Sequence, residues 1–145
     1  MDIFRASIYR AGYPLALLYW AISKPKIDAA TCIIENEGSY LLVRHTYGRR
    51  AVWRSPGGAL KQGEDPCDAA TREVREEVGL ELEGIRSIGH KRMQSSNRNV
   101  ILHIYYGTSS TRDLKLDRGE IREAKWFSVD KLPENIDSSF DLTRI

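Results

Sequence analysis

The segment Pro66–Val78 constrains the fold of this chain more than any other, because it carries both start and stop signals for a helix. Asp65 and Pro66 are residue types favoured at the N-cap and at the first helical position. Gly79 follows directly, and glycine is the residue that most often ends a helix. We therefore predict one helix over residues 66–78, in a chain of 145 residues that has room for a single domain.

This predicted helix has two distinct faces. At about 100° per residue, its apolar stripe consists of Ala70, Val74 and Val78. Glu73, Glu76 and Glu77 lie within an arc of about 100° beside the stripe. Like charges at this spacing repel one another, and Mg²⁺ takes several oxygen ligands. The three carboxylates therefore form a candidate cation site, and a solvated helix surface is the alternative.

Around the helix, short β-rich runs alternate with turn residues. Residues 36–39 (NEGS) have the composition of a hairpin turn, and residues 55–58 (SPGG) are predicted to form a sharp turn. The predicted strands are residues 30–35, 40–45, 83–93, 100–108 and 124–129. Several strands around one strongly marked helix indicate an α+β or α/β fold with a mixed sheet.

Residues 1–26 differ from the rest of the chain. The apolar run 15–22 (LALLYWAI) precedes Pro25, which predicts a short helix that ends at the proline. We assign residues 1–26 to an N-terminal helical extension and residues 27–145 to the main domain. We expect the extension to dock on the domain core, and a homodimer contact and a membrane-surface anchor are the alternatives. The run is too short for a transmembrane segment.

Composition and charge narrow the class of partner. Two cysteines cannot build a disulfide framework, and no secretion signal is visible, so a cytoplasmic domain is expected. The formal charge of +2 is too small to predict a stable complex with nucleic acid. Acidic residues concentrate between residues 64 and 83, directly after a cluster of arginines. This juxtaposition suits a metal-bound polyphosphate, and two solvated faces of opposite sign are the alternative.

Residues 58–80 read GALKQGEDPCDAATREVREEVGL. This segment resembles the signature of the Nudix hydrolase (MutT-like) family: Gly, five residues, Glu, seven residues, then Arg-Glu-aliphatic-x-Glu-Glu-x-Gly-aliphatic. The nine constrained positions all match, and they are Gly58, Glu64, Arg72, Glu73, Val74, Glu76, Glu77, Gly79 and Leu80. The resemblance implies an α+β fold, an α/β/α sandwich in which helices flank a mixed β-sheet, here with an extra N-terminal helix.

The resemblance also implies a reaction. This is the hydrolysis, by metal-activated water, of a diphosphate bond in a nucleoside diphosphate linked to another moiety, such as a nucleoside triphosphate, nucleotide sugar or dinucleoside polyphosphate. The implied cofactor is Mg²⁺ or Mn²⁺, and the implied catalytic residues are Glu64, Arg72, Glu73, Glu76 and Glu77. The implied metal ligands are Glu73, Glu76, Glu77 and the carbonyl of Gly57. Glu120 and Glu123 are candidates for an extra carboxylate outside this segment, with Glu120 as the further metal ligand. Glu64 would orient the metal shell or a water, and Arg72 would hold the carboxylates together. Which glutamate acts as the general base stays open.

Substrate contacts are expected upstream of this segment, because guanidinium groups suit phosphate oxygens and aromatic rings stack on bases. The candidate residues are Arg44, Arg49, Arg50, Arg54, Tyr47 and Trp53. Alternatively, the arginines are solvated charges of a loop and Trp53 lies in the core. His45 is expected to be structural. Two further functions stay open: removal of pyrophosphate from the 5′ end of RNA, and nucleotide sensing without catalysis.

Overall fold

A computed structural model describes residues 2–23, 26–95 and 97–145 of the chain. The helices and strands follow in the order α1 (Asp2–Ser23), β1 (Lys26–Asn36), β2 (Ser39–His45), β3 (Gly57–Ala59), α2 (Pro66–Val78), β4 (Glu83–Ser95), β5 (Arg98–Thr108) and β6 (Ile121–Ser128). Two short 3₁₀ turns, Val129–Lys131 and Leu142–Arg144, follow β6. The five predicted strands are confirmed, each somewhat longer than the run that predicted it or shifted by a few residues.

Strand β1 lies at the centre of a mixed sheet with the order β4-β5-β1-β2-β6. It pairs in parallel with β5 along nearly its whole length, and antiparallel with β2 next to the hairpin turn at residues 37–38. The remaining part of that edge of β1 pairs with β3, from Ala29↔Ala59 to Thr31↔Gly57. The expected fold class, a mixed sheet with flanking helices, is confirmed.

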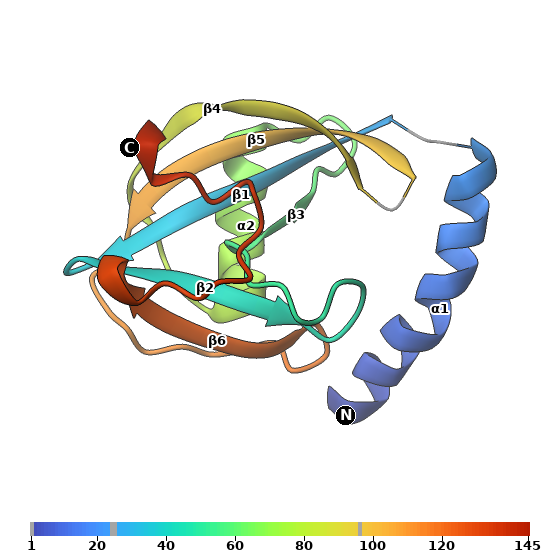
Figure 1. Ribbon diagram of the computed structural model, residues 1–145, viewed down its shortest axis with the longest axis horizontal. Coiled ribbons are helices and arrows are strands. Elements are labelled where there is room, and N and C mark those ends of the chain that lie inside the picture. The colour runs from blue at the N-terminus through green and yellow to red at the C-terminus, as the bar shows by residue number, and fades with distance from the viewer. Residues whose placement is uncertain (1, 24–25, 96) are drawn as a thin grey trace.

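The core lies between the sheet and α2, which packs against one face of it (Figure 1). From the sheet come Cys32, Ile34, Leu41 and Val43, and from the helix Ala69, Ala70, Val74 and Val78. The C-terminal segment crosses the opposite face of the sheet (Figure 1). There the ring of Phe140 packs edge-on against Tyr40, with 5.9 Å between the centroids. The sheet is therefore covered on both faces.

Helix α2 begins and ends where the sequence predicts. The side chain of Asp65 accepts hydrogen bonds from the backbone N–H groups of Cys67 and Asp68. Gly79 adopts the left-handed conformation, with φ of 73°, and its N–H donates to the carbonyl of Arg75. A residue with a Cβ is disfavoured in that conformation, which explains the glycine. These caps fix the position of the helix that carries the glutamates.

Residues 55–58 do not form the predicted sharp turn, because Gly57 and Gly58 are extended and begin β3. A Cβ added to Gly57 would lie 2.3 Å from the backbone oxygen of Ala30. The glycine therefore permits a close approach of two backbones rather than a change of direction.

Helix α1 is longer than the run that predicted it and passes through Pro14. Its apolar side chains Leu15, Leu18, Tyr19 and Ile22 are exposed, so the expected docking of this run on the domain core is wrong. The helical repeat places them away from the face that carries Tyr13, whose ring centroid lies 5.7 Å from that of Tyr47. Pro25, expected to end the helix, lies outside the described residues. In the part of the chain that the structure describes, no helix is both long and apolar enough to cross a membrane.

Candidate functional site

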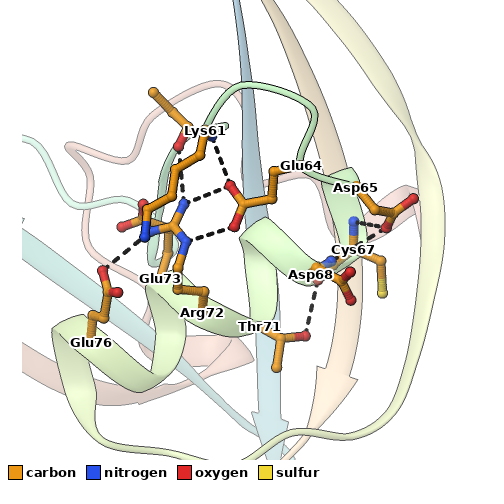
Figure 2. A network of polar contacts seen from close by, with 10 residues as sticks. Lys61, Glu64, Asp65, Cys67, Asp68, Thr71, Arg72, Glu73 and Glu76 are labelled. Atoms are coloured by element: carbon orange, nitrogen blue, oxygen red, sulfur yellow. Dashed lines mark hydrogen bonds and ion pairs between the residues drawn. The ribbon is translucent and has the colours of Figure 1, made fainter.

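The guanidinium of Arg72 lies among three of the glutamates (Figure 2). It donates to both carboxylate oxygens of Glu64 at 2.7 and 2.9 Å, to Glu73 at 2.6 Å and to Glu76 at 3.2 Å. A fifth hydrogen bond runs to the backbone oxygen of Ala59 on β3. Arg72 thus offsets the repulsion between carboxylates on adjacent turns of α2, as expected from the sequence.

Glu64 lies in the loop before α2 and is held from two sides. Besides Arg72, the backbone N–H of Lys61 donates to its carboxylate at 2.8 Å (Figure 2). The hydrogen bonds from Arg72, together with that from Lys61, lower the pKa of Glu64 to about 2. Glu64 is therefore charged at neutral pH, and it orients Arg72 toward the helix.

Glu77 is almost completely buried, with 3% of its side chain exposed. One carboxylate oxygen lies 2.9 Å from Nε2 of His45, at the end of β2, and the other accepts the backbone N–H of Gly57 at 3.1 Å. Because a carboxylate only accepts, we assign the proton of this contact to Nε2. Two partners from two strands therefore fix the buried carboxylate of Glu77.

Glu73 lies one helical turn before Glu77, and its carboxylate faces the second glycine of β3. A Cβ added to Gly58 would lie 2.6 Å from the carboxyl carbon of Glu73, so the glycine makes room for this group. Burial raises the pKa of Glu73, and the hydrogen bond from Arg72 opposes that effect. Glu73 and Glu77 thus both lie against the two glycines at the start of β3.

Among the described residues, no three His, Cys, Asp or Glu side chains lie together in a group that could hold a metal ion as they stand. Instead Arg72 occupies the space between Glu64, Glu73 and Glu76, and the side chain of Glu76 is 55% exposed. The donor chemistry nevertheless fits a hard divalent cation, because it consists of carboxylates next to backbone oxygens of β3. The space that Gly58 leaves for the carboxylate of Glu73 supports this fit.

A cavity of about 690 Å³ lies next to the two glycines. Of the predicted substrate-binding residues, Tyr47, Arg49 and Arg54 line it. The lining also includes residues that the sequence did not single out, from several parts of the chain: Tyr13, Thr31, Ser55, Asp137 and Ser139. These residues are far apart in sequence and carry no shared motif, so only the folded chain brings them together.

Three other predicted substrate-binding residues lie elsewhere. Arg44 forms an ion pair with Glu123 and stacks over the ring of Trp53, 4.7 Å from its centroid. Trp53 is buried and meets Phe127 edge-on, which matches the alternative of a core position. Arg50 is exposed in the loop after β2.

Of the two candidates for the extra carboxylate, Glu123 on β6 forms ion pairs with Arg44 and Lys125, and Glu120 lies just before β6. The backbone oxygen of Glu120 accepts the N–H of Thr46, the residue that follows His45. This hydrogen bond brings the loop of Glu120 next to the end of β2, where His45 contacts Glu77. A role for Glu120 as a ligand stays a prediction.

Comparison with known proteins identifies the family and supports the fold. Residues 25–142 match the NUDIX domain, which covers most of the chain and includes α2 and every strand. The chain belongs to the NUDIX family. A crystal structure of a MutT NUDIX hydrolase from Burkholderia pseudomallei superposes with a TM-score of 0.71, at 20% identity over 79% of this chain and 92% of that one. At that identity the likeness supports the NUDIX fold alone.

Curated relatives are more similar in sequence. The chain is 33% identical over 96 residues, 64% of its length, to the m7GpppN-mRNA hydrolase dcap-2 of Caenorhabditis elegans. It is 32% identical over 108 residues, 71% of its length, to the NAD-capped RNA hydrolase NudC of Vibrio atlanticus. The chain spans only 12% of the first relative and 39% of the second. The match thus covers only part of each of these longer proteins.

The contact between His45 and Glu77 is another part of the candidate site that the sequence did not predict. Leu41 and Val43 of β2 belong to the core against α2, and strand alternation places His45 on the same face. A titratable residue at the end of a series of buried apolar residues on one strand face indicates a contact with a polar group of the facing helix. In this chain that group is Glu77.

Proposed function

We propose that this chain hydrolyses a diphosphate bond in a nucleoside diphosphate linked to another moiety, with Mg²⁺ or Mn²⁺ as cofactor. The observation that carries the proposal is the position of Glu73 and Glu77, which lie on successive turns of α2 against Gly57 and Gly58. Those glycines line the cavity, so the carboxylates are held next to a space of a size that suits a nucleotide. Membership of the NUDIX family and relatives named as hydrolases support the same reaction.

In this proposal Glu73, Glu76 and Glu77 hold the divalent cation, with the carbonyl of Gly57 and with Glu120 as further ligands. When bound, such an ion neutralises phosphate charge and lowers the pKa of a coordinated water. The residues around the ligands keep them in place: His45 and the N–H of Gly57 orient Glu77, and Glu64 orients Arg72. A shift of Arg72 away from Glu73 and Glu76 would free their oxygens for the cation.

Recognition of the phosphates is assigned to arginines of the cavity. Arg49 and Arg54 line it, and both guanidinium groups can donate two parallel hydrogen bonds to phosphate oxygens. Arg44 is not part of this assignment, because its charge is already paired with Glu123. The arginines would hold the substrate with its diphosphate toward the glutamates.

The test is phosphate release from a panel of nucleoside triphosphates, nucleotide sugars and dinucleoside polyphosphates with Mg²⁺ or Mn²⁺. Glu77→Gln is expected to lower kcat at least about 100-fold, because it removes a charge from the ligand set. The matched control is Glu81→Gln, an exposed glutamate just after α2 that pairs with Arg75. Activity that survives Glu77→Gln unchanged would remove Glu77 from the mechanism.

The curated relatives favour a second candidate substrate, the 5′ end of RNA. Both relatives described above are named as hydrolases of capped RNA. The chemistry is the same, so a triphosphorylated RNA and an NAD-capped RNA belong in the panel. Hydrolysis of these RNAs, without hydrolysis of free nucleotides, would favour this candidate.

A catalytically silent nucleotide sensor is the remaining alternative, and the four glutamates Glu64, Glu73, Glu76 and Glu77 argue against it because all are present. Nucleotide binding without hydrolysis of any substrate would favour the sensor. A homodimer through the exposed apolar residues of α1 also stays a prediction. Light scattering of the full chain, compared with a chain that lacks residues 1–24, tests the dimer.

A further inference from the structure

Helix α1 reaches the cavity through Gly12, Tyr13 and Ala16, although it lies outside the residues that match the NUDIX domain. Other residues of the lining come from β1 and β5, such as Thr31 and Leu102. The side chains of α1 that turn away from the domain are Leu15, Leu18 and Ile22, which are exposed. The helix thus presents Tyr13 and Ala16 to the cavity, and Leu15, Leu18 and Ile22 to solvent.

Tyr13 begins a row of three rings that leads to the glutamates. Its ring centroid lies 5.7 Å from that of Tyr47, which in turn lies 5.3 Å from the ring of His45. The hydroxyl of Tyr13 packs against Gly48, where an added Cβ would lie 3.1 Å away. Since Nε2 of His45 contacts Glu77, the row connects α1 with the proposed reaction centre. Aromatic side chains in a row of this kind provide a surface on which a nucleobase can stack.

Two buried polar atoms beside the row have no hydrogen-bond partner among the described residues. They are Nδ1 of His45 and Oγ of Ser55, whose residues are 5% and 4% exposed and line the cavity. Nε of Arg54, from the same lining, is also buried without a partner. Buried polar groups in native proteins are almost always hydrogen-bonded, so these atoms indicate a polar ligand that supplies the missing partners.

The charge of the lining indicates that this ligand is an anion. Among the described residues of the cavity, three are arginines, Arg49, Arg54 and Arg98, and one is an aspartate, Asp137. A ligand that satisfies the rings, the buried polar atoms and the positive charge has a planar heteroaromatic part and an anionic part. A nucleotide meets all three requirements.

We infer that α1 is part of the substrate site, and that Tyr13 and Tyr47 form the wall against which the base of the nucleotide lies. The inference rests on the proposed function in taking the substrate to be a nucleotide. His45 and Ser55 bind polar groups of the ligand, and Tyr13 gives the chain its preference for substrates with an aromatic base. The N-terminal helix therefore has a role in specificity that the NUDIX domain alone does not supply.

The test compares Tyr13→Ala with Tyr19→Ala in the full chain, by calorimetric titration with ADP, GDP, CDP and UDP in the absence of divalent cations. Tyr19 is a matched control, because it lies on the same helix, is 65% exposed and does not line the cavity. Tyr13→Ala is expected to weaken binding of the preferred nucleotide at least tenfold, whereas Tyr19→Ala leaves it unchanged. Tyr13→Phe keeps the ring and is expected to bind as the wild type does.

A second measurement uses a substrate with a base and an inhibitor without one. Tyr13→Ala is expected to raise KM for the nucleoside triphosphate and to leave the inhibition constant of inorganic tripolyphosphate unchanged. Equal nucleotide binding by Tyr13→Ala and wild type, or no binding of the four nucleotides by wild type, overturns the inference. If hydrolysis is lost in Glu77→Gln but nucleotide binding does not depend on Tyr13, the proposed function stands and the inference about α1 is wrong. If binding depends on Tyr13 but no substrate is hydrolysed, the inference stands and the proposed hydrolysis is wrong.

Discussion

His45 on β2 and Glu77 on α2 are joined by a hydrogen bond of 2.9 Å, although both side chains are almost completely withdrawn from solvent. A buried carboxylate is costly unless its oxygens have partners, and Glu77 has two, the second being the N–H of Gly57. This arrangement connects β2, β3 and α2 at the point where the proposed chemistry takes place. It therefore serves the stability of the domain as well as the geometry of the site.

His45→Leu is expected to destabilise the protein, because it leaves one oxygen of Glu77 buried without a donor. The expected loss in free energy of unfolding is about 1–3 kcal/mol, measured by urea denaturation at pH 7. His45→Gln can still donate through its amide and should lose less. Equal stability of His45→Leu and wild type would contradict the assignment of this hydrogen bond.

Alanine at the two glycines of β3 should give two different results. Gly57→Ala places a methyl group against the backbone of β1, which cannot move aside. The expected loss in free energy of unfolding is about 1–3 kcal/mol. Gly58→Ala meets only the end of a flexible glutamate side chain, Glu73, and should cost less stability. It should instead lower metal-dependent activity, because Glu73 must move. The pair is compared by thermal unfolding and by phosphate release.

Addition of Mn²⁺ should raise the melting temperature of the wild type, because a cation that binds only the folded chain stabilises it. At a free concentration of about 100 times Kd, the expected gain is about 2.7 kcal/mol. Glu76→Gln should reduce the gain, and Glu81→Gln, which alters an exposed glutamate outside the ligand set, should keep it. The measurement is thermal unfolding with and without Mn²⁺, followed by addition of EDTA. Equal shifts in all three proteins would argue against Glu76 as a ligand.

The contact between Glu64 and Arg72 predicts a specific dependence of stability on pH. The folded protein holds the pKa of Glu64 at about 2, below its ordinary value of 4.5, so the unfolded chain takes up this proton first as the pH falls. The stability that the contact provides is therefore complete above about pH 4.5 and is lost as the pH falls toward 2. Glu64→Gln should show a smaller loss over this window, measured by urea denaturation at a series of pH values. Glu134→Gln, at an exposed position, controls for the removal of one charge.

Helix α2 was predictable to the residue because its signals are local. Asp65, Pro66 and Gly79 act within one turn of the helix ends, and the apolar stripe at Ala70, Val74 and Val78 follows from the helical repeat alone. The strands were predictable for the same reason, from the composition of short runs. These local signals were sufficient for the fold class.

The contacts of Gly57 were not predictable in this way, because they depend on a partner far away in the chain. The dipeptide Pro-Gly before Gly58 has the composition of a turn, but the nearness of Ala30 requires an extended backbone. The apolar run of α1 was likewise predicted to be buried, and only the placement of Tyr13 beside Tyr47 shows which face of the helix meets the domain. Tertiary packing, rather than composition, decides both.

The parallel pairing of β1 with β5 has a consequence for how the chain folds during synthesis. The β1–β2 hairpin can form early, but one edge of β1 stays without its partner until Thr108 has left the ribosome. An unpaired edge of this kind is a place where two nascent chains can associate, and pairing across so long a separation is intrinsically slow. The interval between the synthesis of β1 and that of β5 is therefore a stage at which slow translation should lower the yield of correctly folded protein.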